Sequence, residues 1–322
     1  MEEKIRSIMD EMAGHLNFSQ LRELQKSLIR NLTENSRLST EITNKDYLKL
    51  FIESKQIEGC TIRTIKYYES TVLNFLEKIT DSVRNIPTET IRSYLATYQQ
   101  INNCSKVTID NIRRNLSSFF SWLEEEDYIL KSPMRRIHKI KTKKQVKEII
   151  NDEEIEILRD HCHTKRDLAI IDILYSTGMR VGELVKLNIS DINFEERECV
   201  VLGKGDKERK VYFDAKAKLH LLDYLNSRTD DNEALFVSLD RPFNRLKISG
   251  IEIRLRELGR KLNINKVHPH KFRRTMATRA IDRGMPIEQV QKILGHSQID
   301  TTMEYAIVSQ INIKNSHRRY LS

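Results

Sequence analysis

Six side chains in the C-terminal half of the chain could together act on a phosphodiester. Two guanidiniums can clamp phosphate oxygens with their rigid forks. Imidazoles and a lysine can donate hydrogen bonds or move protons, and a phenol can attack phosphorus to form a covalent intermediate. Each residue alone also has an ordinary structural interpretation, so the prediction rests on the whole set: Arg180, Lys204, His270, Arg273, His296 and Tyr305.

The first two of these residues follow strong local signals. Gly178 ends a buried helix predicted from "RDLAIIDILYSTG", and Arg180 comes just after it, where it could also pair with Glu183 on the same helical turn. The alternating segment "CVVLGKGDKERKVYF" predicts a β-hairpin. Lys204 would lie at its tip, where an exposed loop lysine is the alternative interpretation.

The other four are predicted on helices or at their ends. His270 and Arg273 are three residues apart and would share one helical face. In "LGHSQIDTTMEY" a helix is expected to end at Gly295, directly before His296. Tyr305 is expected on a following helix, where a tyrosine of the core is the alternative.

The composition predicts a basic, globular chain with more than one domain. The 322 residues carry a formal net charge of +9, with a pI of about 9.2. Such a chain commonly binds a polyanion, and nucleic acid is the first candidate; simple solubility is the alternative. No apolar run approaches the roughly 20 residues that span a bilayer, and the N-terminus has no signal-peptide core. We therefore predict a cytoplasmic protein with no membrane partner.

The cysteines and histidines give no sign of a metal centre. The four cysteines are scattered and form no CxxC pair, so reduced and mostly buried thiols are expected. The "HCH" segment at 161–163 has no second pair of ligands at zinc spacing and is interpreted as a cluster at a helix end. The sequence predicts neither a metal nor any other cofactor.

Few glycines and prolines and a dominant 3.6-residue period predict a fold that is mainly α with a small β-sheet or hairpin region. Residues 1–40 form an accessory amphipathic helical segment, which packs on the next domain or contacts a partner. Residues 41–135 form a helical domain, in which the aromatic run at 119–123 is predicted to be core. Residues 151–322 form a second, mixed domain.

Residues 136–150 are predicted to be a basic interdomain linker, because Pro133 breaks the preceding helix and few large apolar residues follow. A solvated spacer is one interpretation. A strap across a phosphate backbone is the other, and the overall basic charge favours it. The candidate DNA-contacting residues are Arg135, Arg136, Lys139, Lys141, Lys143 and Lys144.

Four motifs resemble, in order and spacing, those of the tyrosine recombinase (phage-type integrase) family, close to its Xer-like branch: "TGMRVGEL", "LGKGDKER", "HPHKFRRTMAT" and "LGHSQIDTTMEYA". The segments "TIKYYESTVLNFL" and "FFSWLEEEDYILKSPM" resemble the family's core-binding, SAM-like domain. The resemblance covers about residues 41–310. It implies a helical core-binding domain and a mixed α+β catalytic domain that clamp a DNA duplex.

The resemblance implies a role for each candidate in cleavage. Tyr305 would attack the phosphate, form a 3′-phosphotyrosyl link and release a 5′-hydroxyl. Lys204 would protonate the leaving 5′-oxygen, and His270 would assist proton transfer from the tyrosine. Because the link stores the bond energy, religation would need neither ATP nor a metal.

The resemblance also implies how the phosphate is held. Arg180 and Arg273 would bind its oxygens and stabilise the pentavalent transition state. His296 would donate a further hydrogen bond, and Glu183 matches an acidic support residue. Arg274 is a departure, since many relatives have histidine there; we expect it to affect local packing rather than the chemistry.

The partners implied are a double-stranded DNA recombination site and a homotetramer on two such sites, with the tail after Tyr305 packed into a neighbouring protomer or in cis. Integration, excision, inversion and resolution stay open, as do a mobile-element role and a need for a paralogue or accessory factor. Two alternatives use the same fold: a type IB topoisomerase-like nicking-closing enzyme and a non-catalytic DNA-binding regulator. A metal-dependent integrase is disfavoured because no three-carboxylate pattern is visible.

Overall fold

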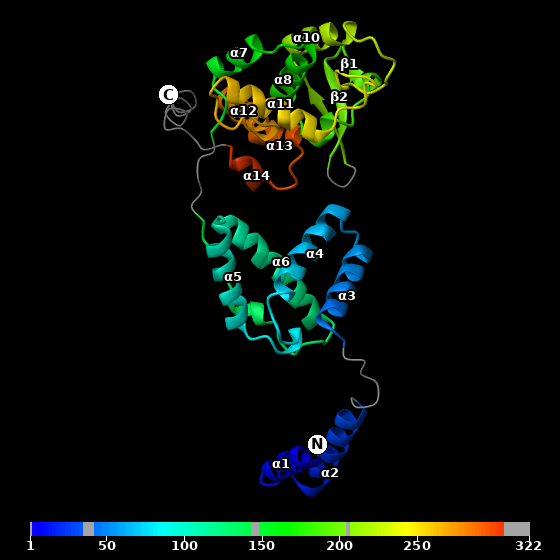
Figure 1. Ribbon diagram of the computed structural model, residues 1–322, viewed down its shortest axis with the longest axis vertical. Helices are drawn as coiled ribbons and strands as arrows, with labels where there is room; N and C mark the ends of the chain where they lie inside the picture. Colours follow the sequence, from blue (N-terminus) through cyan, green and yellow to red (C-terminus); the bar gives the residue numbers. More distant parts are fainter. Residues whose placement is uncertain (1, 35–41, 143–147, 204–206, 306–322) are drawn as a thin grey trace. The chain divides into compact units, whose positions relative to one another are not determined.

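The computed structural model describes residues 2–34, 42–142, 148–203 and 207–305. The chain divides into two compact units: an N-terminal unit, residues 1–144, and a C-terminal unit, residues 145–322. Helices dominate both units, and a small sheet lies in the second (Figure 1). The fold is therefore mainly α with a small sheet, as predicted.

The N-terminal unit is helical over all its regular elements in the described ranges. Three of its helices begin after residues whose side-chain oxygens accept a backbone N–H of the first turn, namely Thr43, Thr61 and Ser105. The elements are α1 (Glu2–Met12), α2 (Phe18–Glu34), α3 (Asn44–Ile57), α4 (Ile62–Leu76), η1 (Val83–Asn85), α5 (Thr88–Asn102), α6 (Lys106–Glu125) and η2 (Pro133–Arg136).

Aromatic side chains fill the core between α3, α4, α5 and α6. Phe119 is fully buried and lies with its ring centroid 5.3 Å from that of Phe51 and 5.4 Å from that of Phe120. The predicted burial of the aromatic run at 119–123 is confirmed. This run therefore stabilises the unit and is not available for stacking on bases.

The first described part of the predicted linker packs on the N-terminal unit. Ile137 and Ile140 lie partly buried against its core. The amide of Ile140 donates a 3.0 Å hydrogen bond to the Asp110 carboxylate on α6. Residues 137–140 are therefore held by the N-terminal unit rather than free as a spacer.

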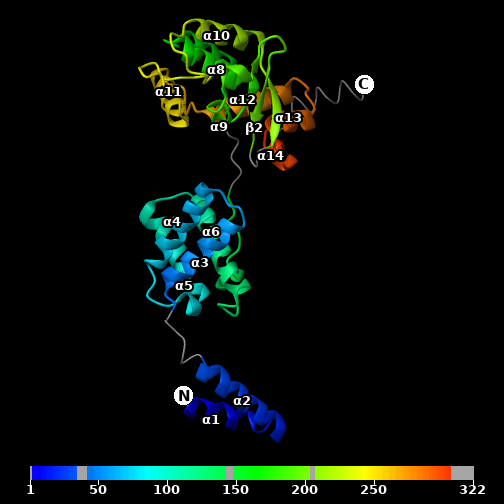
Figure 2. The same cartoon turned by 90° about the vertical axis from the view of Figure 1, so that its right-hand side faces the viewer.

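The C-terminal unit surrounds α8, which contacts both α10 and α12 and can be followed in Figure 2. Apolar residues on α8, such as Ile171 and Leu174, are fully buried. Its elements are α7 (Asp152–Asp160), α8 (Lys165–Thr177), α9 (Val181–Leu184), η3 (Ile189–Asp191), β1 (Ile192–Asn193), β2 (Glu198–Leu202), β3 (Glu208–Tyr212), α10 (Ala215–Asn226), α11 (Ile248–Lys261), α12 (Pro269–Asp282), α13 (Ile287–Leu294) and α14 (Ile299–Met303).

The predicted hairpin forms as the antiparallel pair β2 and β3, and the short β1 adds a third strand in the order β1-β2-β3. Cys199 pairs with Ile192 on one side and with Val211 on the other. All three side chains are buried, because alternate residues of a strand face the same side of the sheet. The sheet thus covers one side of the core of this unit.

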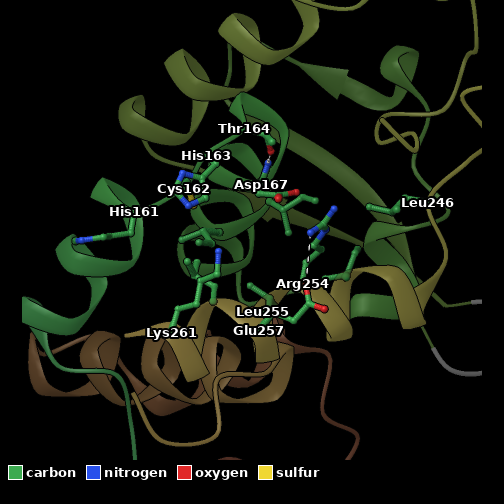
Figure 3. Close-up of a pocket in the computed structure, with 14 residues that line it drawn as sticks. His161, Cys162, His163, Thr164, Asp167, Leu246, Arg254, Leu255, Glu257 and Lys261 are labelled. Atoms are coloured by element: carbon green, nitrogen blue, oxygen red, sulfur yellow. Dashed lines mark hydrogen bonds and ion pairs between the residues drawn. The ribbon is translucent and has the colours of Figure 1, made fainter. Parts of the chain in front are cut away.

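The helices and the metal-ligating side chains of the described ranges bear on membrane insertion and on metal binding. None of the helices in the described ranges is long and apolar enough to cross a membrane. Within the same ranges no group of three or more His, Cys, Asp or Glu side chains is placed to hold a metal ion. His161 follows α7 and, with Cys162 and His163, lines a pocket beside α11, although Figure 3 shows its side chain directed away from those of Cys162 and His163.

Candidate active site

Arg180 is presented by a sharp turn at the end of α8. Gly178 adopts a left-handed conformation, with φ at 61°, and ends the helix as predicted. A Cβ atom at this glycine would lie 2.1 Å from the Met276 Cε atom of α12. Because Met276 Cε ends a flexible side chain that can shift, it is the left-handed conformation that favours glycine, and the turn places Arg180 at the start of α9.

Arg180 is held by Glu183, as the i, i+3 spacing suggested. The Glu183 carboxylate accepts the backbone N–H of Arg180 at 2.7 Å and its Nη1 at 2.9 Å. Burial alone would raise the pKa of this carboxyl, but the hydrogen bonds and charges of Arg209 and Arg180 outweigh burial and hold the pKa below its usual range. Glu183 is therefore an anion that orients a cation.

Arg273 lies on α12 with its guanidinium almost fully buried, at 3% exposure. Its Nη1 donates to the Gly178 carbonyl at 2.8 Å, and its Nη2 lies 2.5 Å from the Leu294 carbonyl and 3.0 Å from His296 Nε2. Burial and the nearby charges of Arg180 and Arg209 lower the pKa of Arg273 to about 10. The group stays protonated at neutral pH, in a place where an anion would relieve the repulsion.

His296 follows the predicted helix end, because α13 stops at Leu294 and Gly295 adopts φ at 64°. Its Nδ1 lies 2.9 Å from the Thr302 hydroxyl. Burial, then the charges of Arg273 and Arg180, lower the pKa of His296 to about 4. Since arginine can only donate, Nε2 accepts from Arg273 and the neutral ring carries its proton on Nδ1.

Tyr305 lies beside His296, with the two ring centroids 6.0 Å apart. It packs partly buried against a small apolar cluster that includes Val290 and Leu294. The prediction that Tyr305 lies on a helix is wrong, because α14 ends at Met303. The amide of Tyr305 donates to the Thr302 carbonyl at 2.9 Å, in a turn that carries the tyrosine back toward His296.

The structure describes His270, whereas Lys204 lies outside the described residues. His270 is an exposed residue in the first turn of α12, three residues before Arg273. Burial of part of the ring, then the charges of Arg273 and Arg180, lower the pKa of His270. In the chain, Lys204 falls between the end of β2 and the start of β3.

The candidate DNA-contacting residues of the linker belong to the N-terminal unit or fall outside the description. Arg135 pairs with Glu124 on α6 and keeps more than half of its side chain exposed. Arg136, Lys139 and Lys141 are exposed, whereas Lys143 and Lys144 lie outside the described residues.

The sequence analysis missed Arg209 on β3. Its Nη1 and Nη2 donate to the two oxygens of Glu183 at 2.8 and 2.7 Å, and its Nε donates to the Ile293 carbonyl at 2.8 Å. The strand pattern contained a signal, since Arg209 alternates with Lys210 and faces the same side as the buried Val211. The partners of Arg209 could not be read from that pattern.

The arrangement can bind and attack a phosphodiester, since two arginines, a neutral histidine and a tyrosine meet at the ends of α8, α12 and α13. Residues 138–310 match the phage integrase family, and residues 47–130 match the phage integrase N-terminal SAM-like domain. The chain therefore belongs to the phage integrase family, the tyrosine recombinases.

Individual relatives agree with this assignment. The tyrosine recombinase XerC of Oceanobacillus iheyensis is 30% identical over 85% of this chain and 95% of its own length. The tyrosine recombinase XerA of Pyrococcus furiosus is 32% identical over 85% of this chain and 93% of its own length. The Tn1549 transposon integrase, solved in complex with transposon right end DNA, shares the fold: the TM-score is 0.73 at 18% identity, over 86% of this chain and 99% of that one.

The chain is a tyrosine site-specific recombinase of the Xer-like branch, as its motifs predicted. The comparisons favour recombination over a type IB topoisomerase-like enzyme or a non-catalytic regulator.

Proposed function

We propose that this recombinase cleaves and rejoins a duplex DNA site through Tyr305. The observation that carries the proposal is the buried Arg273 guanidinium, which contacts His296 beside the Tyr305 ring and faces the charge of Arg180. Such a fixed cluster of donors needs little reorganisation when negative charge develops on a phosphate. The phenol oxygen of Tyr305 forms the new bond to phosphorus as the 5′-oxygen leaves.

Arg180 and Arg273 would clamp the non-bridging oxygens. The Arg180 side chain is 33% exposed, and its Nη2 makes only a long 3.4 Å contact with the Gly295 carbonyl, so this end can turn to a phosphate. Arg180 and Arg209 repel the buried Arg273, and a bound phosphate anion would offset this unfavourable electrostatic free energy. This supports phosphate rather than a neutral group as the ligand.

His296 would donate a hydrogen bond to the phosphate from Nε2. In the DNA-free protein that atom accepts from Arg273, so a bound phosphate must take over the Arg273 donor. The phosphate also favours protonation of the ring, because an adjacent anion raises the pKa of a histidine. The Thr302 hydroxyl holds the other ring nitrogen and keeps the ring in place.

Proton transfers are assigned to the two remaining candidates. His270 would take the proton of the Tyr305 phenol, which a histidine with a lowered pKa can do because it is neutral at neutral pH. Lys204 would give a proton to the leaving 5′-oxygen. Its place in the hairpin that follows Gly203 supports this assignment, because that glycine lies beside Glu183 and Arg209.

The DNA partner and assembly follow from the family. A recombination site of double-stranded DNA is the substrate we propose, and the exposed lysines and arginines at 135–141 would neutralise its phosphates. We further propose a homotetramer on two sites in the cytoplasm, which acts in integration, excision, inversion or resolution. A paralogue or an accessory factor is a further candidate partner.

The test is a search for a covalent protein–DNA adduct in EDTA. The DNA carries the inverted repeats next to the gene, and the protein is compared with Tyr305→Phe. We expect an SDS-resistant adduct from the wild type and none from the variant, with DNA binding unchanged. Tight binding without an adduct from either protein would overturn the proposal in favour of a non-catalytic regulator, and an adduct that needs a metal ion would contradict the mechanism.

A further inference from the structure

Three arginines meet at the C-terminal end of α13. The carbonyl of Ile293 accepts from Arg209, that of Leu294 from Arg273 and that of Gly295 from Arg180. The last carbonyls of a helix have no partner within the helix and carry partial negative charge, so cations are favoured there. The donor-to-oxygen distances are 2.8 Å for Arg209 Nε, 2.5 Å for Arg273 Nη2 and 3.4 Å for Arg180 Nη2.

Arg209 differs from the other two in that each of its three guanidinium nitrogens donates a hydrogen bond to a protein oxygen in the described structure. Its two terminal nitrogens hold both oxygens of Glu183, and its Nε holds the Ile293 carbonyl. The side chain is only 11% exposed. Because both ends of its fork are held by the Glu183 carboxylate, Arg209 is better suited to join parts of the protein than to bind a phosphate.

The turn that leads to His296 rests directly on the Arg209 side chain. A Cβ atom at Gly295 would lie 2.9 Å from Arg209 Cδ and 3.1 Å from its Nε. Gly295 also has φ at +64°, which a side chain would strain. The position of this turn therefore depends on where the Arg209 side chain lies.

The same side chain reaches the hairpin that carries Lys204. A Cβ atom at Gly203 would lie 3.4 Å from Arg209 Nη1 and 4.0 Å from Glu183 Oε1. The amide of Gly203 donates to the Lys207 carbonyl at 2.8 Å, which closes the hairpin just before its tip. Arg209 thus touches the β2 side of the hairpin next to its tip, the carboxylate that orients Arg180 and the end of α13.

We propose that Arg209 is a positioning residue for strand cleavage, which fastens the β2–β3 hairpin to the end of α13 and so sets Arg180, through Glu183, and the turn of His296. The inference rests on the proposed function of the cluster. A displacement of about 1 Å at reacting groups can lower a rate on the order of 10²-fold. A side chain that fixes two phosphate-binding groups at once should therefore affect the rate without touching DNA.

The experiment compares Arg209→Met and Arg209→Lys with Lys210→Met in the full chain. Lys210 is a matched control, since it lies next to Arg209 on β3 but faces the other side and pairs with Glu198. The first readout is the single-turnover rate of adduct formation on the inverted-repeat duplex, with DNA affinity measured in parallel. We expect Arg209→Met to lower the rate on the order of 10²-fold, with affinity changed about twofold or less.

Lysine keeps the charge but not the bidentate fork, so Arg209→Lys should restore little of the rate. Glu183→Gln, alone and combined with Arg209→Met, tests whether the two act as one unit. In that case the double variant is no slower than the slower single variant, because effects within one network are not additive. Independent, multiplying losses would overturn the coupling through Glu183.

The second readout is amide hydrogen exchange in the DNA-free protein, which does not depend on activity. We expect Arg209→Met and Arg209→Lys to speed exchange at 294–298 and in β2–β3, and Lys210→Met to leave it unchanged. Unchanged exchange and rates within twofold of the wild type for Arg209→Lys would overturn the proposal. A wild type that makes no adduct refutes the proposed function instead, and exchange still decides whether Arg209 fastens the hairpin to α13.

Discussion

In the N-terminal unit the large buried side chains are mostly aromatic, whereas the C-terminal unit buries several ionised groups. The buried polar groups of the first unit include a neutral pair, in which Asn115 donates to the Thr71 hydroxyl at 3.0 Å, and one carboxylate, Asp110, which is 9% exposed and pairs with Arg113. The second unit keeps the following charged residues under its surface at 5% exposure or less: Arg166, Asp172, Glu183, Lys271 and Arg273. The interior of the first unit is therefore held mainly by apolar packing, whereas that of the second also contains several ionised side chains.

The two cores differ in the free energy that burying their side chains costs. Burying an ion costs several kcal/mol unless partners replace its water. Each of these five buried charges has such partners; the Lys271 ammonium, for example, donates to the Asn265 carbonyl at 2.8 Å. The aromatic core needs only area and shape. Buried, paired charges occur in proteins where fixed charges must face a substrate. Three substitutions test this difference between the two units.

The largest effect is expected from Phe119→Ala in the aromatic core. Loss of a fully buried phenyl ring destabilises a core by about 3–5 kcal/mol, because a cavity remains. Trp122 is the only tryptophan of the chain and lies in this core, so its fluorescence reports unfolding of the N-terminal unit. Leu130→Ala, at a fully exposed position, is the control and should leave the midpoint unchanged. Equal unfolding midpoints for Phe119→Ala and Leu130→Ala would contradict the proposed role of the aromatic core in stability.

A smaller effect is expected from Arg273→Lys, which keeps the buried charge but removes the fork. Lysine cannot reach the carbonyls of Gly178 and Leu294 together, so we expect adduct formation to slow about 10²-fold, or about 2.7 kcal/mol. The Trp122 transition should not move. Arg254→Lys, at an exposed position on α11, is the matched control. A rate close to that of the wild type would mean that charge alone suffices at this position.

The smallest effect is expected from Arg274→Met. Arg274 Nη1 donates to the Glu148 carbonyl at 2.7 Å and so ties α12 to the last part of the predicted linker. One exposed hydrogen bond is worth about 1 kcal/mol, and we expect a loss of that size, seen as faster amide exchange in α12. Arg283→Met, at the exposed end of the same helix, should not change it. A loss of several kcal/mol would show that this contact supports the core.

Much of the local structure could be predicted from short patterns. Alternation predicted the β2–β3 hairpin, and glycines predicted the ends of α8 and α13, because each depends on neighbouring residues or on a backbone conformation that glycine favours. The helix expected at Tyr305 failed for a physical reason. The chain leaves α14 after Met303 in a turn that places the phenol beside His296, and no local period encodes that contact.

By itself the sequence determined the fold class, the basic charge and the residue types available for chemistry on a phosphodiester. Only the tertiary structure decided how they are coupled. Arg209 reaches the Ile293 carbonyl across 84 positions of the chain, and Arg180 reaches Gly295 across 115. A guanidinium finds such partners only after the sheet and α13 have packed together, since helical and strand periods report which side chains are buried but not which distant carbonyl lies within hydrogen-bond distance.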